Sequence, residues 1–290
     1  MKHRLIITAD DYGMCDSVNR AIDTCAEARV VLSTNVMANM DKAEEAFDLK
    51  KRFPYISVGI HYNFTVGKPL SPADQVRSLI HQDGTFLSYP EIRKKCKEGT
   101  YNFKEIVQEM KLQYKRYREI CGEPDYWNTH ENVHVYPKLY QLFRDEALSV
   151  GIKKMRSHQR IFIPSSNGKK SRSLRWLLTE PFKEIMLNSW QNQSKKLGIS
   201  APDGILVRMN EDDKLNLSYL FSHIVWKSAH VAELAIHPSI NGNNEYFGEI
   251  TDLRVKEYQC FSSHNVLDIA NKNDIEIVGF ETVGENNDRY

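Results

Sequence analysis

The chain has 290 residues, with 39 basic and 38 acidic side chains and a formal net charge of +1. Hydrophobic residues make up 41% of it, which is typical of a folded water-soluble protein. This charge balance gives no electrostatic reason to expect nucleic acid or an anionic membrane as a partner. The length suits one large α/β domain or two small ones.

The five cysteines include no Cys-x-x-Cys pair, so neither a disulfide framework nor a zinc–cysteine site is indicated. The apolar run after Arg4 is short and meets two Asp residues, so we expect no signal peptide. No stretch approaches the roughly 20 apolar residues that span a bilayer. These features favour a cytoplasmic location.

Predicted strands and helices alternate along the chain. Strands are expected at 4–9, 30–37, 55–60, 125–129, 152–156, 231–236 and 274–280. Helices are expected at 16–29, 41–53, 103–121, 137–150, around 180–196, 215–226 and 252–271. Between them we expect a long connection at 64–100, an irregular excursion at 157–213 with at least one helix, and a polar loop at 239–250 that is a candidate lid.

Repeated strand–helix units imply parallel strands with helices outside them. At least seven such strands along the chain favour a TIM-barrel-like (β/α) barrel, with room for fewer than eight strands, over an open sheet. No Gly-rich phosphate-binding pattern follows the first strand, which disfavours a dinucleotide-binding fold. No linker divides the chain, so we expect a single α/β domain over residues 1–290.

Asp10 and Asp11 follow the first predicted strand directly. Where a backbone turns at a strand end, two adjacent carboxylates can line one pocket. Burying two like charges together costs free energy unless a cation or a proton offsets it, so the pair suggests a metal site or a proton shuttle. The alternative is that one of them caps the helix that follows, as Asp often does.

Three histidines stand at the ends of other predicted strands: His61, His130 and His237. Pro238 follows His237 and cannot continue a central strand, so that strand stops there. A lone His is more often structural than a ligand, but this coincidence at separate strand ends is harder to dismiss. Catalytic groups of parallel barrels lie at the C-terminal ends of strands. One Asp with two His leaves open the coordination positions that a catalytic metal needs.

Six motifs occur in order and resemble the YdjC-like carbohydrate deacetylases over essentially the full chain. They are LIITADDYG at the start, VLSTNVMAN (31–39), VGIHYNFTVGKPL (58–70), THENVHVYP (129–137), APDG (201–204) and AIHP (235–238). Each motif is weak alone, whereas the ordered set is specific. The resemblance implies a TIM-barrel-type enzyme that removes acetyl groups from N-acetylated sugars such as chitooligosaccharides (diacetylchitobiose), and it also implies a homodimer.

The resemblance also assigns roles by motif position. Asp11, His61 and His130 would bind one divalent metal ion, Asp10 would be the general base, and His237 would be the general acid. These ligands suit zinc by their softness, while an open site with water also accepts magnesium, manganese or cobalt.

Two further residues are candidates for substrate binding, and each has more than one possible role. Arg156 could bind a sugar hydroxyl or a carboxylate of the substrate, or it could be a structural ion-pair partner. His134 could contact the substrate, support a metal ligand, or have no catalytic role.

One segment departs from the family pattern. The family usually reads Asp-Ser-His-x-His-Val-His, whereas here Asn128 stands for the leading Asp and Asn132 for the middle His. The site would then lack a carboxylate that orients a metal-bound His. This departure favours one alternative function, a non-catalytic sugar-binding relative. The other alternative is a different metal-dependent hydrolase on a similar barrel, such as a phosphoesterase or an amidohydrolase.

Overall fold

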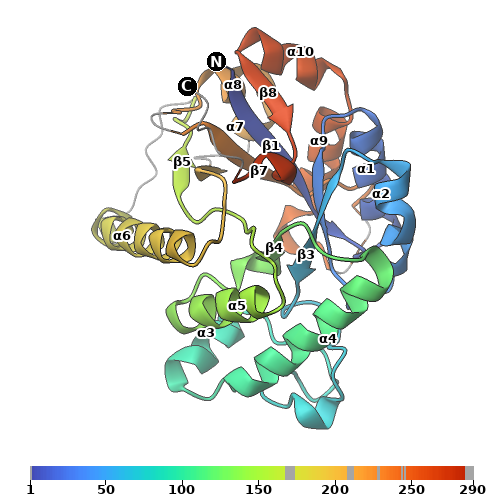
Figure 1. Ribbon diagram of the computed structural model, residues 1–290, viewed down its shortest axis with the longest axis vertical. Helices are drawn as coiled ribbons and strands as arrows, with labels where there is room; N and C mark the ends of the chain where they lie inside the picture. Colours follow the sequence, from blue (N-terminus) through green and yellow to red (C-terminus); the bar gives the residue numbers. More distant parts are fainter. Residues whose placement is uncertain are drawn as a thin grey trace.

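The computed structural model describes residues 2–166, 174–207, 212–226, 229–242, 244 and 246–284. Within these residues, eight strands form one curled sheet with helices around it (Figure 1). The strands are β1 (His3–Tyr12), β2 (Ser33–Val36), β3 (Ser57–Tyr62), β4 (Trp127–Thr129), β5 (Arg160–Phe162), β6 (Gly204–Val207), β7 (Val231–Ile236) and β8 (Ile275–Val278). The helices are α1 (Asp16–Glu27), α2 (Leu49–Arg52), α3 (Tyr89–Glu98), α4 (Phe103–Cys121), α5 (Pro137–Ser149), α6 (Leu174–Lys196), α7 (Asp212–Leu215), α8 (Leu217–Ser222), α9 (Thr251–Phe261) and α10 (Asn265–Lys272).

The strands run in the order β4-β3-β2-β1-β7-β6-β5, and β8 pairs with the first half of β1. All of these pairings are parallel. Isolated parallel bridges link Trp127 of β4 to Met155, and Lys154 to Ser200, which precedes β6. The expected TIM-barrel-like architecture of parallel strands is therefore confirmed, while among the described residues β4 and β5 do not pair with each other.

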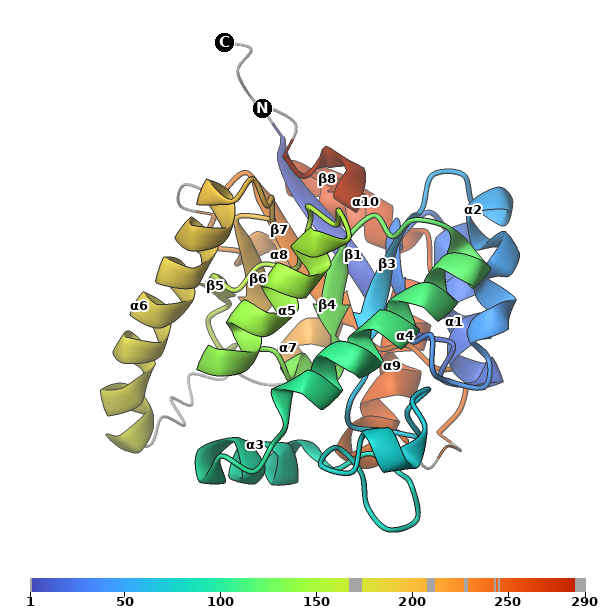
Figure 2. The same ribbon diagram turned by 60° about the horizontal axis from the view of Figure 1, so that its bottom comes forward.

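The central position of β1 follows from its sequence. Leu5, Ile6 and Ile7 are fully buried, as expected for a parallel strand covered on both faces. Helix α4 begins after Asn102, whose side chain accepts a hydrogen bond from the Lys104 amide, and it buries an apolar face against the sheet. Figure 2 shows α4 and α5 lying across the outside of β3 and β4.

Several boundaries differ from the sequence-based prediction. Residues 152–156 are not a regular strand, because only Lys154 and Met155 make isolated bridges there, and the next strand is β5. The expected excursion at 157–213 contains two barrel strands, β5 and β6, along with α6. These strands have three and four residues, which is too short for an alternating pattern to stand out.

The helical predictions also need correction in four places, one of which is the helix predicted at 215–226: α7 ends at Leu215, and α8 covers only Leu217–Ser222. The connection at 64–100 contains α3, which begins with a capping box between Ser88 and Glu91. The helix predicted at 41–53 is a 3-10 turn (Ala43–Asp48) followed by the short α2. The helix predicted at 252–271 breaks into α9 and α10. Among the described residues, no helix is both long and apolar enough to cross a bilayer.

Candidate metal and catalytic site

The side chains singled out from the sequence lie at the C-terminal ends of four strands. Asp10 and Asp11 are in β1, His61 is in β3, His130 follows β4, and His237 follows β7. Because the strands are parallel, their C-terminal ends lie together at one end of the barrel-like sheet. The structure therefore brings together the residues that the strand pattern predicted.

An irregularity in β1 explains how two adjacent carboxylates share one site. The pairing of β1 with β2 shifts register between Ala9 and Tyr12, and Asp11 has a φ of 75°, a left-handed conformation that is uncommon outside glycine. This bulge turns two successive side chains out of strict alternation. The helix-capping alternative is wrong, since Cys15 occupies the N-cap of α1 and both carboxylates bond elsewhere.

Asp11 is the centre of a buried triad. Its Oδ1 lies 2.9 Å from Nδ1 of His130 and 3.2 Å from Nε2 of His61. The three ligand atoms lie within 4.8 Å of one another, and all three residues are buried. One carboxylate oxygen and two imidazole nitrogens at this spacing fit a divalent metal ion with open positions.

Arg254, from α9, holds the second oxygen of Asp11. Its Nη2 donates to Oδ2 at 2.6 Å. Burial alone would raise the pKa of Asp11, but His130 and Arg254 outweigh it and hold that pKa well below its ordinary value. Asp11 is therefore a carboxylate at neutral pH, which is the form that binds metals.

The backbone after β4 presents His130 to the site. Glu131 and Asn132 have φ values of 51° and 53°, so the chain makes a left-handed turn directly after the histidine. Asn tolerates this conformation better than most residues. Asn132 is exposed in this turn, so the second departure from the family pattern lies outside the metal triad.

Asp10 forms a two-pronged ion pair with Arg156. Nη1 of Arg156 donates to Oδ2 and Nη2 donates to Oδ1, both at 2.7 Å, while Nε donates to Glu233 in β7 at 2.9 Å. Asn35 in β2 donates to Oδ1 of Asp10 at 2.6 Å. Arg156 is therefore an ion-pair partner, as one of the two interpretations of the sequence expected. Its guanidinium is shared between two buried carboxylates.

This ion pair sets the protonation of Asp10. Burial favours the neutral acid, but the charge and hydrogen bonds of Arg156 dominate and hold the pKa of Asp10 well below its ordinary value. Glu233 was not identified from the sequence. The available signal was an acidic residue inside the otherwise apolar segment Val231–Ile236.

His237 lies beside Asp10 with a partly exposed ring. Its Nε2 is 3.6 Å from Oδ2 of Asp10, and its side chain is 31% exposed. Its backbone amide donates to Glu257, which pairs with Lys214. Burial lowers the pKa of His237 to about 4, so the ring is neutral at pH 7 rather than protonated at rest.

His134 is buried beneath the site. Its Nδ1 lies 2.6 Å from the Thr129 hydroxyl, and its Nε2 lies 2.7 Å from Nε2 of His158. Both of its ring nitrogens are therefore engaged inside the protein. Burial lowers the pKa of both rings, to about 3 for His158, so the pair is neutral at pH 7. His158 was not identified, because it lies in a segment without clear periodicity.

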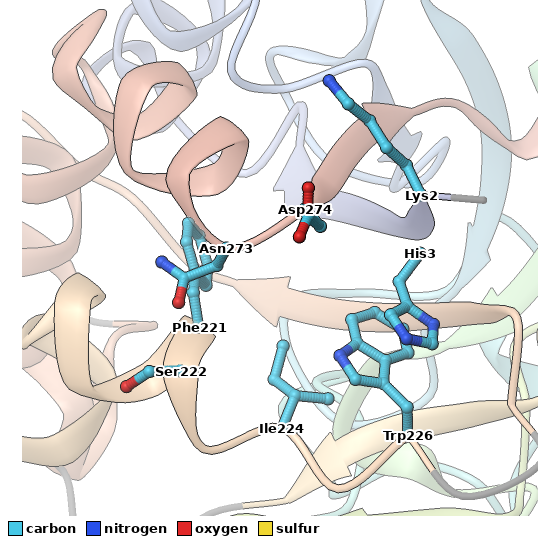
Figure 3. Close-up of a pocket in the computed structure, with 8 residues that line it drawn as sticks. All are labelled: Lys2, His3, Phe221, Ser222, Ile224, Trp226, Asn273 and Asp274. Atoms are coloured by element: carbon cyan, nitrogen blue, oxygen red, sulfur yellow. The ribbon is translucent and has the colours of Figure 1, made fainter.

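A separate pocket lies at the opposite end of the strands. It has a volume of about 530 Å³ and is lined by His3 at the start of β1, Trp226, and Asp274 before β8, among others (Figure 3). The His3 ring stacks on Trp226 with centroids 4.3 Å apart. None of the site residues described above lines this pocket.

Comparison with known proteins identifies a family. The profile described as YdjC-like protein matches residues 4–272. Among curated proteins, the chain is 33% identical over 157 residues to carbohydrate deacetylase 2 of Listeria innocua, covering 53% of this chain and 60% of the relative. It is 31% identical over 148 residues to a chitooligosaccharide deacetylase of Proteus mirabilis, covering 51% of this chain and 56% of the relative.

These matches span about half the length of the curated relatives. Among solved structures, one from Enterococcus faecalis V583, provisionally described as a cellobiose-phosphate cleavage protein, superposes with a TM-score of 0.73 at 21% identity. The superposition covers 97% of this chain and 99% of that one. At this identity the likeness concerns the fold.

Proposed function

Because this chain belongs to the YdjC-like protein family, we propose that it is a metal-dependent deacetylase acting on N-acetylated sugars such as chitooligosaccharides. The observation that carries the proposal is the buried triad of Asp11, His61 and His130, with Asp10 and His237 beside it. The names of the curated relatives support the substrate class. The proposed cofactor is one divalent metal ion per chain, either zinc or magnesium.

In the proposed reaction, water replaces the sugar nitrogen on the acetyl carbon, giving acetate and a free amine. A divalent ion held by the triad would polarise the acetyl carbonyl and make bound water more acidic. Asp11 is ionised and Arg254 fixes its orientation, so the ligand is in place before substrate arrives.

Asp10 and His237 would move the protons. Asp10 is ionised at neutral pH and accepts the proton of the attacking water, but its pairing with Arg156 makes it a weak base. His237 is neutral at rest and lies 3.6 Å away, so it can take this proton at Nε2. It then donates the proton to the departing nitrogen, because an amine leaves poorly unless it is protonated.

Arg156 and His134 were expected to contact the substrate, and we now propose an indirect role for both. Both side chains are buried and hydrogen-bonded to protein groups, so we propose that they act by supporting Asp10 and the floor of the site. A cytoplasmic location and a homodimer are proposed as well, and fractionation and light scattering would test them.

Incubation with N,N′-diacetylchitobiose and with a panel of phosphate esters tests the reaction class. Release of acetate without phosphate supports the proposal. Phosphate release would favour a phosphoesterase on the same barrel. Tight binding of the sugar without release of acetate would favour a non-catalytic relative.

A further inference from the structure

Asn128, at the end of β4, is fully buried between two sets of polar groups. One end of its amide lies 2.5 Å from Nδ1 of His61. The other end faces both terminal nitrogens of Arg156 at 3.1 Å and Nδ2 of Asn35 at 3.0 Å. The orientation of this amide therefore decides which hydrogen bonds exist on both sides.

The groups on the inner side are all hydrogen-bond donors. The guanidinium of Arg156 stays protonated in a protein. Asn35 points its NH2 group at this place because that group also donates to Oδ1 of Asp10 at 2.6 Å. An amide oxygen satisfies these donors, whereas an amide NH2 group would face only other N–H groups. The amide oxygen of Asn128 therefore belongs on the inner side.

This orientation fixes the tautomer of His61. With its oxygen inward, Asn128 donates an N–H to Nδ1 of His61, so Nδ1 must be the acceptor and the ring proton must be on Nε2. That proton has a partner, because Nε2 lies 3.2 Å from Oδ1 of Asp11. However, Nε2 is also the atom that faces the triad, and a metal requires its lone pair.

We propose that Asn128 is the positioning residue that sets the tautomer of His61 and couples metal binding to a turn of its own amide. When a metal occupies Nε2, the proton moves to Nδ1 and the amide oxygen must face it. The NH2 group of Asn128 then meets the donors of Arg156 and Asn35 without an acceptor. A carboxylate at this position would accept hydrogen bonds from both sides and remove the conflict.

Asn128→Asp therefore tests the inference, which rests on the proposed metal site only for its effect on metal affinity. Long-range ¹H–¹⁵N NMR on metal-free protein reports the His61 tautomer, with His61→Gln assigning the signals. Zinc affinity is measured separately by competition with a chromogenic chelator. Asn132→Asp is the matched control, because it adds the same charge to the same segment at an exposed position.

We expect metal-free wild type to carry the His61 proton on Nε2 and Asn128→Asp to carry it on Nδ1. Partners that orient a metal-bound His are worth about 10- to 100-fold in metal affinity, so Asn128→Asp should bind zinc at least about tenfold more tightly, with Asn132→Asp like wild type. An Nδ1 proton in the metal-free wild type, or equal zinc affinity of wild type and Asn128→Asp, overturns the inference. If neither protein binds zinc, the proposed function loses its metal, and the tautomer spectra alone then decide the role of Asn128.

Discussion

The two terminal nitrogens of Arg156 donate hydrogen bonds to both carboxylate oxygens of Asp10 at 2.7 Å, while its Nε donates to Glu233. This contact joins two distant segments of the chain, since the two residues are 146 positions apart. It holds Asp10 ionised in a buried place where a lone carboxylate would take up a proton. The protonation of the proposed base thus depends on a residue that the substrate need not touch.

Asp10→Asn should keep the metal site and lose turnover. The substitution removes the proposed proton acceptor but leaves Asp11, His61 and His130 in place. Loss of a general base costs about 10² to 10⁴ in rate. Steady-state kinetics together with metal analysis of the purified variant measure both effects. Full activity of Asp10→Asn would remove Asp10 from the mechanism.

Arg156→Met should move the acidic limb of the kcat/KM profile to higher pH. The proposed mechanism needs ionised Asp10 and neutral His237, so activity is lost as the pH falls through the higher of their two pKa values, which in the wild type is that of His237, about 4. Arg156 lowers the pKa of Asp10, so its removal raises that pKa, and the limb moves to higher pH when the pKa of Asp10 exceeds that of His237. Arg156→Lys keeps a positive charge and should shift the limb less. An unmoved limb in Arg156→Met would show that Asp10 stays ionised down to the pKa of His237 without Arg156, against the role given to this pair.

The Arg156→Met variant should also be less stable. It leaves Asp10 and Glu233 buried without their shared cation, and breaking a buried ion pair typically costs about 3–5 kcal/mol. Kinetics should therefore be measured below the unfolding temperature of the variant, found from thermal unfolding.

Asp11→Ala should lose the metal ion. Asp11 is the anionic member of the triad, and its Oδ1 is the atom to which both histidines converge. Metal analysis after dialysis should find less than one ion per chain, whereas the exposed-site control Asp252→Ala should bind as wild type does. Stoichiometric metal in Asp11→Ala would refute the ligand assignment.

The buried His134–His158 pair should make stability fall in acid. The folded-state pKa of His158 is about 3, below its ordinary value of 6.5, so the folded protein keeps the ring neutral while the unfolded chain binds a proton. Stability is thus complete above about pH 6.5 and is lost as the pH falls toward 3, by up to about 1.4 kcal/mol per pH unit for one group.

Denaturant unfolding between pH 7 and 4 measures this slope. His158→Gln should reduce the slope of the unfolding free energy against pH by the amount that corresponds to about one bound proton. The exposed control His264→Gln should not change this slope. Equal slopes in wild type and His158→Gln would mean that His158 is protonated in the folded protein.

The parallel-strand architecture and the position of the site could be predicted from the sequence. Strands that end at a carboxylate or a histidine are local signals, and the parallel order of the strands converts them into one cluster. Helix α4 and strand β7 have the predicted boundaries because each has a clear apolar pattern and a definite stop.

The groups that tune the site could not be predicted in the same way. Arg254 and Glu257 lie on α9, and their importance depends on contacts with Asp11 and His237 that no local pattern encodes. Asn128 could be recognised as a departure from a family pattern, but its contacts with His61 and Arg156 arise only when β3, β4 and the segment at Arg156 come together. Long-range packing decides the charge and hydrogen bonding of these groups.

The central claim is that this chain releases acetate from N-acetylated sugars with the help of a metal ion. The most direct measurement is acetate release from N,N′-diacetylchitobiose and chitotriose by metal-stripped protein resupplied with zinc, magnesium, manganese or cobalt. The account predicts little release without metal and its return with at least one of these ions. No release with any of them, from protein shown to bind the ion, would contradict it.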